Sequence, residues 1–170
     1  MARAGFWAGT LGFGLGGFLD GILLHQILQW HHLLSLVDGI GDLRAQVLSD
    51  GVFHLAMSLL AAVGLWGLWR AWRRGGRPSG AFVLGAVLVG FGTWHLIDAV
   101  ASHWLLGLHR IRLDAANPLA WDLGWLAAFG LLPMALGAAL QRRGGRALGG
   151  GGLAALAALA LGAGLWAGRA

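Results

Sequence analysis

Aspartate and histidine recur at a fixed spacing inside two long apolar stretches of the sequence. Each copy holds one aspartate and two histidines, and the second copy lies 78 residues after the first: Asp20, His25 and His31, then Asp98, His103 and His109. Ionisable side chains are costly within a membrane, and those that occur there are usually functional. The matched copies predict that two halves of the chain build one polar site between them.

The spacing within each copy limits how these side chains can meet. The aspartate and the first histidine are five residues apart, which is roughly 140° around an α-helix. The aspartate and the second histidine are eleven residues apart, which is roughly 16 Å along the helix axis. We therefore expect that one helix alone cannot place all three side chains around an ion, and that a site must combine helices.

Four more ionisable residues lie in the apolar stretches. Asp50 and His54 are four residues apart and share a helix face, and His95 shares a face with Asp98 in the same way. Asp122 opens the fourth apolar stretch as Asp50 opens the second. These residues are placed to join the two copies of the repeated pattern.

Imidazole and carboxylate groups together suit a transition metal ion such as Cu, Zn or Fe. The predicted metal site draws on four histidines and four aspartates: His25, His54, His95, His103, Asp20, Asp50, Asp98 and Asp122. The aspartates would act as ligands or as partners that hold imidazole N–H groups. A single ion on the axis between the halves and a pair of ions both fit the repeat.

Some histidines have a histidine at the equivalent position of the other half, and others do not. His54 and His95 have no histidine at their counterpart positions, so we expect them to complete a site whose shared members are His25 and His103. The remaining histidines follow the apolar stretches, so they are expected at the outer water interface with a smaller part in metal binding: His31, His32 and His109.

Other readings of the same residues stay open. Haem b is the main competing cofactor, because two histidines on facing helices can ligate it axially. A proton- or ion-coupled transporter could use the aspartates and histidines as a relay, and a purely structural polar network is a third reading. The chain has no cysteine, which excludes a thiolate metal site and covalent c-type haem. No reaction follows from these residues, so whether the protein is an enzyme stays open.

Composition places the site in a membrane protein. The chain is 58% hydrophobic and 11% charged, whereas soluble domains carry about 25% charged residues. The continuous apolar runs predict an all-α membrane bundle in contact with the lipid bilayer. The formal charge of +5 does not indicate nucleic acid, because the arginines cluster in short loops, as orientation signals do.

The apolar runs predict one membrane domain, 1–170, with about five transmembrane helices at 4–30, 49–70, 80–108, 118–140 and 148–168. The first two helices form repeat A (about 4–70) and the next two form repeat B (about 80–140), related as parallel repeats. The extra helix, about 148–168, has no counterpart, and it is expected to pack or to contact another copy or a membrane-protein partner.

The arginine-rich loops predict the orientation. Arg70 to Arg77 and Arg142 to Arg146 lie in the loops after the second and fourth helices, which should face the cytoplasm. The N-terminus is then cytoplasmic as well. The ionisable residues of the first four helices should all lie in the outer half of the membrane.

Three strings carry a resemblance to a known family: GGFLDGILLHQILQWHHLLS at 16–35, SDGVFH at 49–54 and WHLIDAVASHWLLGLHRIR at 94–112. They resemble a bacterial family of predicted membrane proteins, the domain of unknown function numbered twenty-two forty-three. The family tends to have Asp-His-His where this chain has Asp98-Ala99-Val100. Because the family has no established activity, the resemblance implies membership and a bacterial inner-membrane location, but no mechanism.

Overall fold

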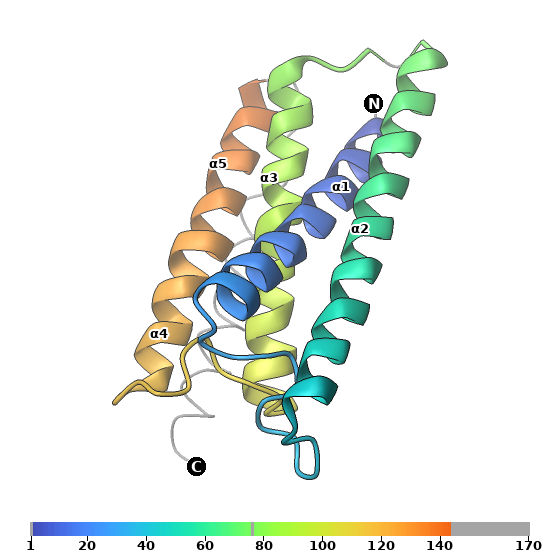
Figure 1. Ribbon diagram of the computed structural model, residues 1–170. Helices are drawn as coiled ribbons and strands as arrows, with labels where there is room; N and C mark the ends of the chain where they lie inside the picture. The colour runs from blue at the N-terminus through green and yellow to red at the C-terminus, as the bar shows by residue number, and fades with distance from the viewer. Residues whose placement is uncertain (1, 76, 144–170) are drawn as a thin grey trace.

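The computed structural model describes residues 2–75 and 77–143, and every regular element in them is helical (Figure 1). Three of the continuous helical stretches contain a π-helical segment, which is labelled η. In chain order the elements are α1 (Ala2–Asp20), η1 (Gly21–Ile27), α2 (Leu43–Arg73), α3 (Gly80–Ile97), η2 (Asp98–Leu105), α4 (Pro118–Trp125), η3 (Leu126–Leu131) and α5 (Leu132–Arg143).

Four continuous helical runs are long and apolar enough to cross a membrane: Ala2–Ile27, Leu43–Arg73, Gly80–Leu105 and Pro118–Arg142. At about 1.5 Å per residue, each exceeds the roughly 30 Å of a hydrocarbon core. The predicted all-helical membrane architecture is therefore confirmed for the described residues. The predicted fifth helix, 148–168, lies outside them.

Helix starts follow local capping chemistry. Asp42, Ser79 and Asn117 each accept a backbone N–H three residues on, from Ala45, Phe82 and Ala120. Such caps satisfy amide groups that have no partner inside the helix. The predicted start at 49 was six residues late, because α2 begins directly after the Asp42 cap.

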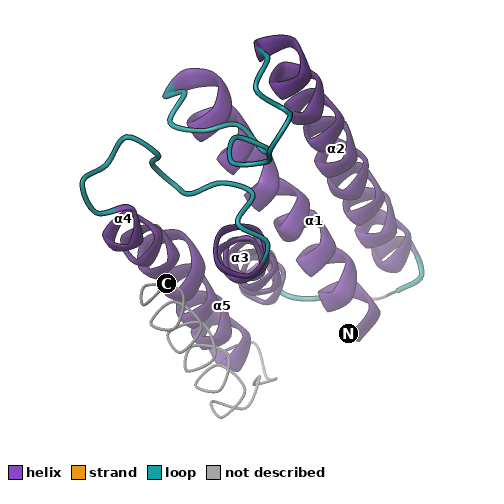
Figure 2. Ribbon diagram, turned by 90° about the horizontal axis from the view of Figure 1, so that it is seen from below, coloured by secondary structure: helices purple, strands orange, loops and turns teal. Residues whose placement is uncertain are grey.

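The four runs stand side by side in the order α2, α1, α3, α5, with α1 and α3 in the middle (Figure 2). Glycine lets the two central helices approach closely. A Cβ atom on Gly12 would overlap the carbonyl oxygen of Val87, and one on Gly90 would overlap that of Gly9. These two contacts are related by the 78-residue offset, so the halves meet through equivalent positions.

The loops 28–42 and 106–117 lie at one end of the bundle, and the N-terminus and the α2–α3 turn lie at the other (Figure 1). Leu36 N–H donates to the carbonyl oxygen of Leu108 at 2.8 Å, which ties one loop to the other. The loops together cover the ends of η1 and η2. We call this the loop end of the bundle.

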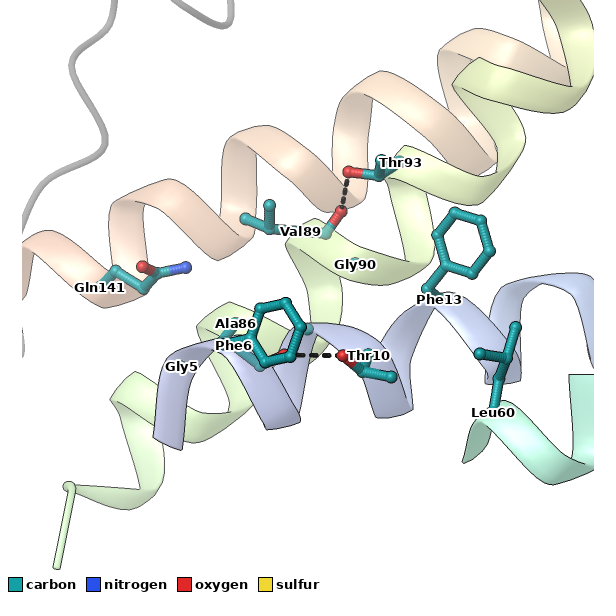
Figure 3. A pocket seen from close by; sticks show the side chains of 11 residues that line it. Gly5, Phe6, Thr10, Phe13, Leu60, Ala86, Val89, Gly90, Thr93 and Gln141 are labelled. Atoms are coloured by element: carbon teal, nitrogen blue, oxygen red, sulfur yellow. Dashed lines mark hydrogen bonds between the residues drawn. The ribbon is translucent and has the colours of Figure 1, made fainter. Parts of the chain in front are cut away.

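An apolar groove of about 590 Å³ runs along α1 and α3 (Figure 3). Its two threonines bond within their own helices, Thr10 to the Phe6 carbonyl and Thr93 to the Val89 carbonyl. Among the described residues that line it, Gln141 is the most polar and none is ionisable. The groove therefore suits hydrocarbon, and the chemistry of the protein must be sought elsewhere.

Candidate metal centre

Asp98 and His103 come together on a single helical segment. Both belong to η2, where backbone hydrogen bonds run from residue i to i+5, so residues five apart lie one above the other. Asp98 Oδ2 is 3.0 Å from His103 Nε2. The expectation that this spacing separates the two side chains was wrong, because it assumed α-helical geometry throughout.

His109 also reaches Asp98. The η2 segment ends at Leu105, and Gly107 adopts a φ of 62°, which reverses the chain. His109 Nε2 then lies 3.6 Å from Asp98 Oδ1. The predicted axial separation was wrong because the helix ends three residues earlier than expected. The donor atoms of Asp98, His103 and His109 all lie within 4.8 Å of one another.

The first half repeats this path. The η1 segment ends at Ile27, and Gln29, the counterpart of Gly107, adopts a φ of 51°. The chain folds back so that His31 Nε2 lies 3.1 Å from His25 Nε2. The ring centroids of His25 and His31 are 4.7 Å apart at 69°, and the matching pair in the second half is 4.8 Å apart at 69°.

The rings of His31 and His109 stack at the contact between the halves, 4.4 Å apart and inclined by 5°. Together with His25 and His103 they form a buried group that we call the histidine tetrad. His31 is 2% exposed and His109 is 1% exposed. The prediction that these two histidines lie at the water interface was therefore wrong, because the two loops fold over them.

Backbone carbonyls fix the tautomers of the stacked histidines. His31 Nδ1 lies 3.0 Å from the carbonyl oxygen of Ile111, and His109 Nδ1 lies 3.0 Å from that of Leu33. A carbonyl only accepts, so each Nδ1 must donate, and in a neutral ring the lone pair is then on Nε2. Burial and the neighbouring His109 lower the pKa of His31 to about 2, so this ring is neutral and able to bind a metal.

Asp122 contacts Nδ1 of His103, the ring nitrogen that is not near Asp98. Its Oδ1 accepts from His103 Nδ1 at 3.1 Å and from Ile111 N–H at 3.0 Å. Its Oδ2 accepts from Trp104 Nε1 at 3.2 Å and from an Arg110 guanidinium N–H at 2.7 Å. The carboxylate is fully buried. A carboxylate on the rear nitrogen is the usual way in which proteins orient a metal-binding imidazole.

Asp50 takes the same position in the first half. Its Oδ1 accepts from Leu33 N–H at 2.9 Å and lies 3.0 Å from His25 Nδ1, in an oblique contact. Its Oδ2 lies 2.6 Å from His32 Nδ1. Asp50 of α2 and Asp122 of α4 thus act as partners of the imidazoles rather than as members of the converging donor set.

The converging atoms have distances that suit an ion. Donors at about 2.0–2.1 Å from a tetrahedral Zn²⁺ lie roughly 3.3 Å apart. The observed contacts of Asp98 with His103 and His109 are 3.0 and 3.6 Å. Both Nε2 atoms are buried, and within residues 2–75 and 77–143 neither makes an aligned hydrogen bond. These atoms approach one another without hydrogen-bond alignment, as ligands aimed at a common point do.

His54 and His95 lie on the flanks of this group. His95 Nδ1 accepts from Trp125 Nε1 at 3.1 Å, with the ring of Phe91 against it. The His54 ring packs against Gly21, 6.2 Å from the His25 ring centroid. Neither residue belongs to the converging donor set among the described residues. Their predicted role as ligands stays a prediction that the geometry does not favour.

The sequence reasoning gave His31 and His109 a smaller part in the site, and it did not foresee the two backbone carbonyls that orient them. A signal was available, because both histidines belong to the repeated pattern, whereas His54 and His95 do not. The two histidines of the converging set recur at the 78-residue offset, whereas His54 and His95 do not.

No characterised protein and no solved structure matches the chain. The sequence profile of a family described as "Predicted membrane protein (DUF2243)" matches residues 8–144. The matched region contains both copies of the aspartate and histidine pattern and the loops that fold over the tetrad. The resemblance noted in the sequence is confirmed, and the chain belongs to this membrane protein family.

Proposed function

We propose that the protein binds a transition metal ion at the loop end of the bundle, for metal handling or redox chemistry. The observation that carries this proposal is the convergence of Asp98, His103 and His109 on a buried point. Each histidine places its rear nitrogen, Nδ1, at a fixed acceptor and its Nε2 toward Asp98, which is how proteins orient a metal-binding imidazole. Imidazole nitrogen with one carboxylate suits Zn, Cu or Fe.

The burial of the donor residues limits the functions that a bound ion could serve. The three donor residues are each 4% exposed or less. A hydrolytic metal site needs an open coordination position that a substrate can reach. An enclosed site favours holding or relaying the metal, or electron transfer, over hydrolysis of a large substrate.

Haem b fits the tetrad less well. The closest imidazole rings in it contact one another, with centroids 4.4 to 4.8 Å apart. A porphyrin between two axial imidazoles would have to part these rings. A small ion needs only the space between the converging nitrogen and oxygen atoms.

A proton- or ion-coupled transporter is also less favoured. Such a path needs polar side chains along the whole depth of the membrane. Among the described residues, the buried polar side chains gather toward the loop end, and Gln141 at the far end is the exception. Between these regions, α1 and α3 approach so closely that a Cβ atom on Gly12 or Gly90 would overlap backbone of the other helix.

The proposal places the protein in the bacterial inner membrane as two parallel two-helix repeats, with the N-terminus cytoplasmic and the tetrad on the outer side. The repeat is supported by the crossed carbonyl contacts of His31 and His109. The orientation is supported by the arginines of the α2–α3 turn. At the loop end, Arg110 and Arg112 are neutralised by Asp122 and Asp114.

A reporter that is active only in the cytoplasm tests this orientation. Fused at the α2–α3 turn, residues 74–79, it should be active, and fused in the loop 28–42 it should be silent. Activity at the second position with silence at the first would reverse the orientation and place the tetrad on the cytoplasmic side.

Elemental analysis of detergent-purified protein, together with its absorption spectrum, tests the metal proposal. We expect bound Zn, Cu or Fe in fixed proportion to protein and no Soret band. A His103→Ala, His109→Ala double variant should lose metal. Asp114→Asn, at a side chain 71% exposed, is the matched control and should keep it. A Soret band would favour haem, and protein that stays metal-free after reconstitution would contradict the proposal.

A further inference from the structure

We propose that a pocket between α1 and α2 binds the phosphate headgroup of an anionic phospholipid. The pocket encloses about 510 Å³ and lies at the end of the bundle opposite the loop end, beside the N-terminus and the end of α2 (Figure 1). Three arginines line it, Arg3, Arg70 and Arg74, together with two tryptophans and otherwise only alanine and glycine. Because the tetrad lies at the other end, this inference does not depend on the metal proposal.

One face of α2 forms the basic wall of the pocket. Trp66, Arg70 and Arg74 follow one another at intervals of four residues, so they share a helix face. The guanidinium carbon of Arg70 lies 4.7 Å from the centroid of the Trp66 ring, and this cation–π contact holds the charge at the pocket wall. Arg3, in the first turn of α1, adds a third guanidinium from the other helix.

The two helices approach closely where they enclose the pocket. Gly67 of α2 is buried, and a Cβ atom there would overlap the ring of Trp7. The indole of Trp7 therefore lies against the backbone of α2, and both residues line the pocket. Both helices belong to runs that can cross a membrane, and the pocket lies at the ends of those runs. Tryptophan at such ends lies at the level of the lipid headgroups.

The charge of the pocket is not balanced by the protein. Among the described residues, arginine forms salt bridges only at the loop end. The acidic residues on the two helical runs that form the pocket are Asp20 and Asp50, which lie 17 residues from Arg3 and 20 residues from Arg70. These intervals correspond to roughly 25–30 Å along a helix. Like charges around one cavity repel one another, and an anion bound among them removes that repulsion.

Phosphate is the anion that this lining fits, and a lipid is the source that the position favours. A guanidinium presents paired N–H donors that match phosphate oxygens. Basic pockets between membrane helices on the cytoplasmic side bind lipid headgroups, and this end of the bundle is cytoplasmic in the proposed orientation. A free phosphate ion would use the arginines alone, whereas a lipid also covers the indole and alanine surface. A zwitterionic headgroup would bring its own cation among the arginines, so an anionic lipid is preferred.

Native mass spectrometry of the full-length protein in detergent, titrated with single lipids, tests the proposal. We expect phosphatidylglycerol to bind more tightly than phosphatidylcholine. Each basic residue near a membrane surface contributes roughly fivefold in affinity. The Arg70→Gln, Arg74→Gln double variant should therefore bind phosphatidylglycerol roughly 25-fold more weakly, and Arg3→Gln roughly fivefold more weakly. Arg3→Gln and the comparison of the two lipids keep the test decisive if the double variant does not fold.

The Arg73→Gln, Arg77→Gln double variant is the matched control. Arg73 lies over the Trp69 ring at 5.8 Å, as Arg70 lies over that of Trp66, but Arg73 and Arg77 are not part of the pocket lining. This control loses the same charge at the same end of the bundle. It should keep its affinity for phosphatidylglycerol.

Three results would contradict the proposal. Equal weakening in the two double variants would mean that the lipid is attracted by the overall charge of this end and not by the pocket. Equal affinity of the unaltered protein for phosphatidylglycerol and phosphatidylcholine would exclude selection for an anionic headgroup. Displacement of phosphatidylglycerol by inorganic phosphate at equal concentration would make the pocket a site for the free ion.

Discussion

Replacing His31 or His109 with alanine is expected to weaken metal binding more than replacing His54 or His95. His109 presents its Nε2 to the converging donors, the ring of His31 stacks on it, and the opposite half fixes the Nδ1 of each. Losing a direct ligand should cost more than the roughly 10–100-fold that loss of an orienting partner costs. The order is the reverse of that expected from the sequence.

Competition with a chromophoric zinc chelator measures this difference in the purified variants. His54→Ala and His95→Ala are the controls, because both residues are histidines at the same end of the bundle and outside the converging set. Each variant is compared by its unfolding midpoint in detergent, which separates loss of a ligand from loss of the fold. Full occupancy in His109→Ala combined with loss in His54→Ala would move the metal to the flank of the tetrad.

The sequence predicted the four long apolar helices of the described residues, because a helix that can span a membrane needs a continuous apolar run of about 20 residues. Continuous apolar runs located the helices of the described residues, and the arginine-rich turn separated the second from the third. The helix ends were less accurate. The predicted ends at 30 and 108 fall beyond Ile27 and Leu105, where the π-helical segments end and the chain turns back.

The site could be predicted in composition but not in geometry. The residue types and the 78-residue repeat indicated a shared polar site, and Asp98 with His103 belongs to it. A spacing of five residues separates side chains on an α-helix and aligns them on a π-helix. No local residue preference in the sequence predicted the change from α-helical to π-helical geometry. The stacking of His31 on His109 depends on loops from both halves, which a scan of single helices does not capture.

The histidines without a counterpart, His54 and His95, lie outside the converging donor set. Trp125 donates to Nδ1 of His95, and His54 fills the space over Gly21, so each has a packing role as well. The residues that repeat have contacts that repeat as well. A contact that occurs in both halves requires the same residue at the two equivalent positions. A histidine that occurs in one half only makes no such repeated contact.

Gly12→Ala and Gly90→Ala are expected to destabilise the bundle and to weaken metal binding together. The added Cβ atoms would overlap the carbonyl oxygens of Val87 and Gly9, and a backbone cannot turn aside as a side chain can. Overpacking typically costs about 1–3 kcal/mol, and a clash with backbone belongs at the upper end of that range or beyond it. The helices α1 and α3 must part to relieve it.

Parting these helices also reaches the tetrad, because α1 leads into η1 and α3 leads into η2, which carry His25 and His103. Unfolding in mixed detergent micelles measures the stability change, and zinc titration measures the binding change. Gly124→Ala is the matched control, since its Cβ would meet nothing within 4 Å. It should be neutral or stabilising by roughly 0.5–1 kcal/mol, because alanine suits a helix better than glycine. If Gly12→Ala kept both stability and zinc affinity, the halves would not be held together at this crossing, and the tetrad would have to be positioned by its loops alone.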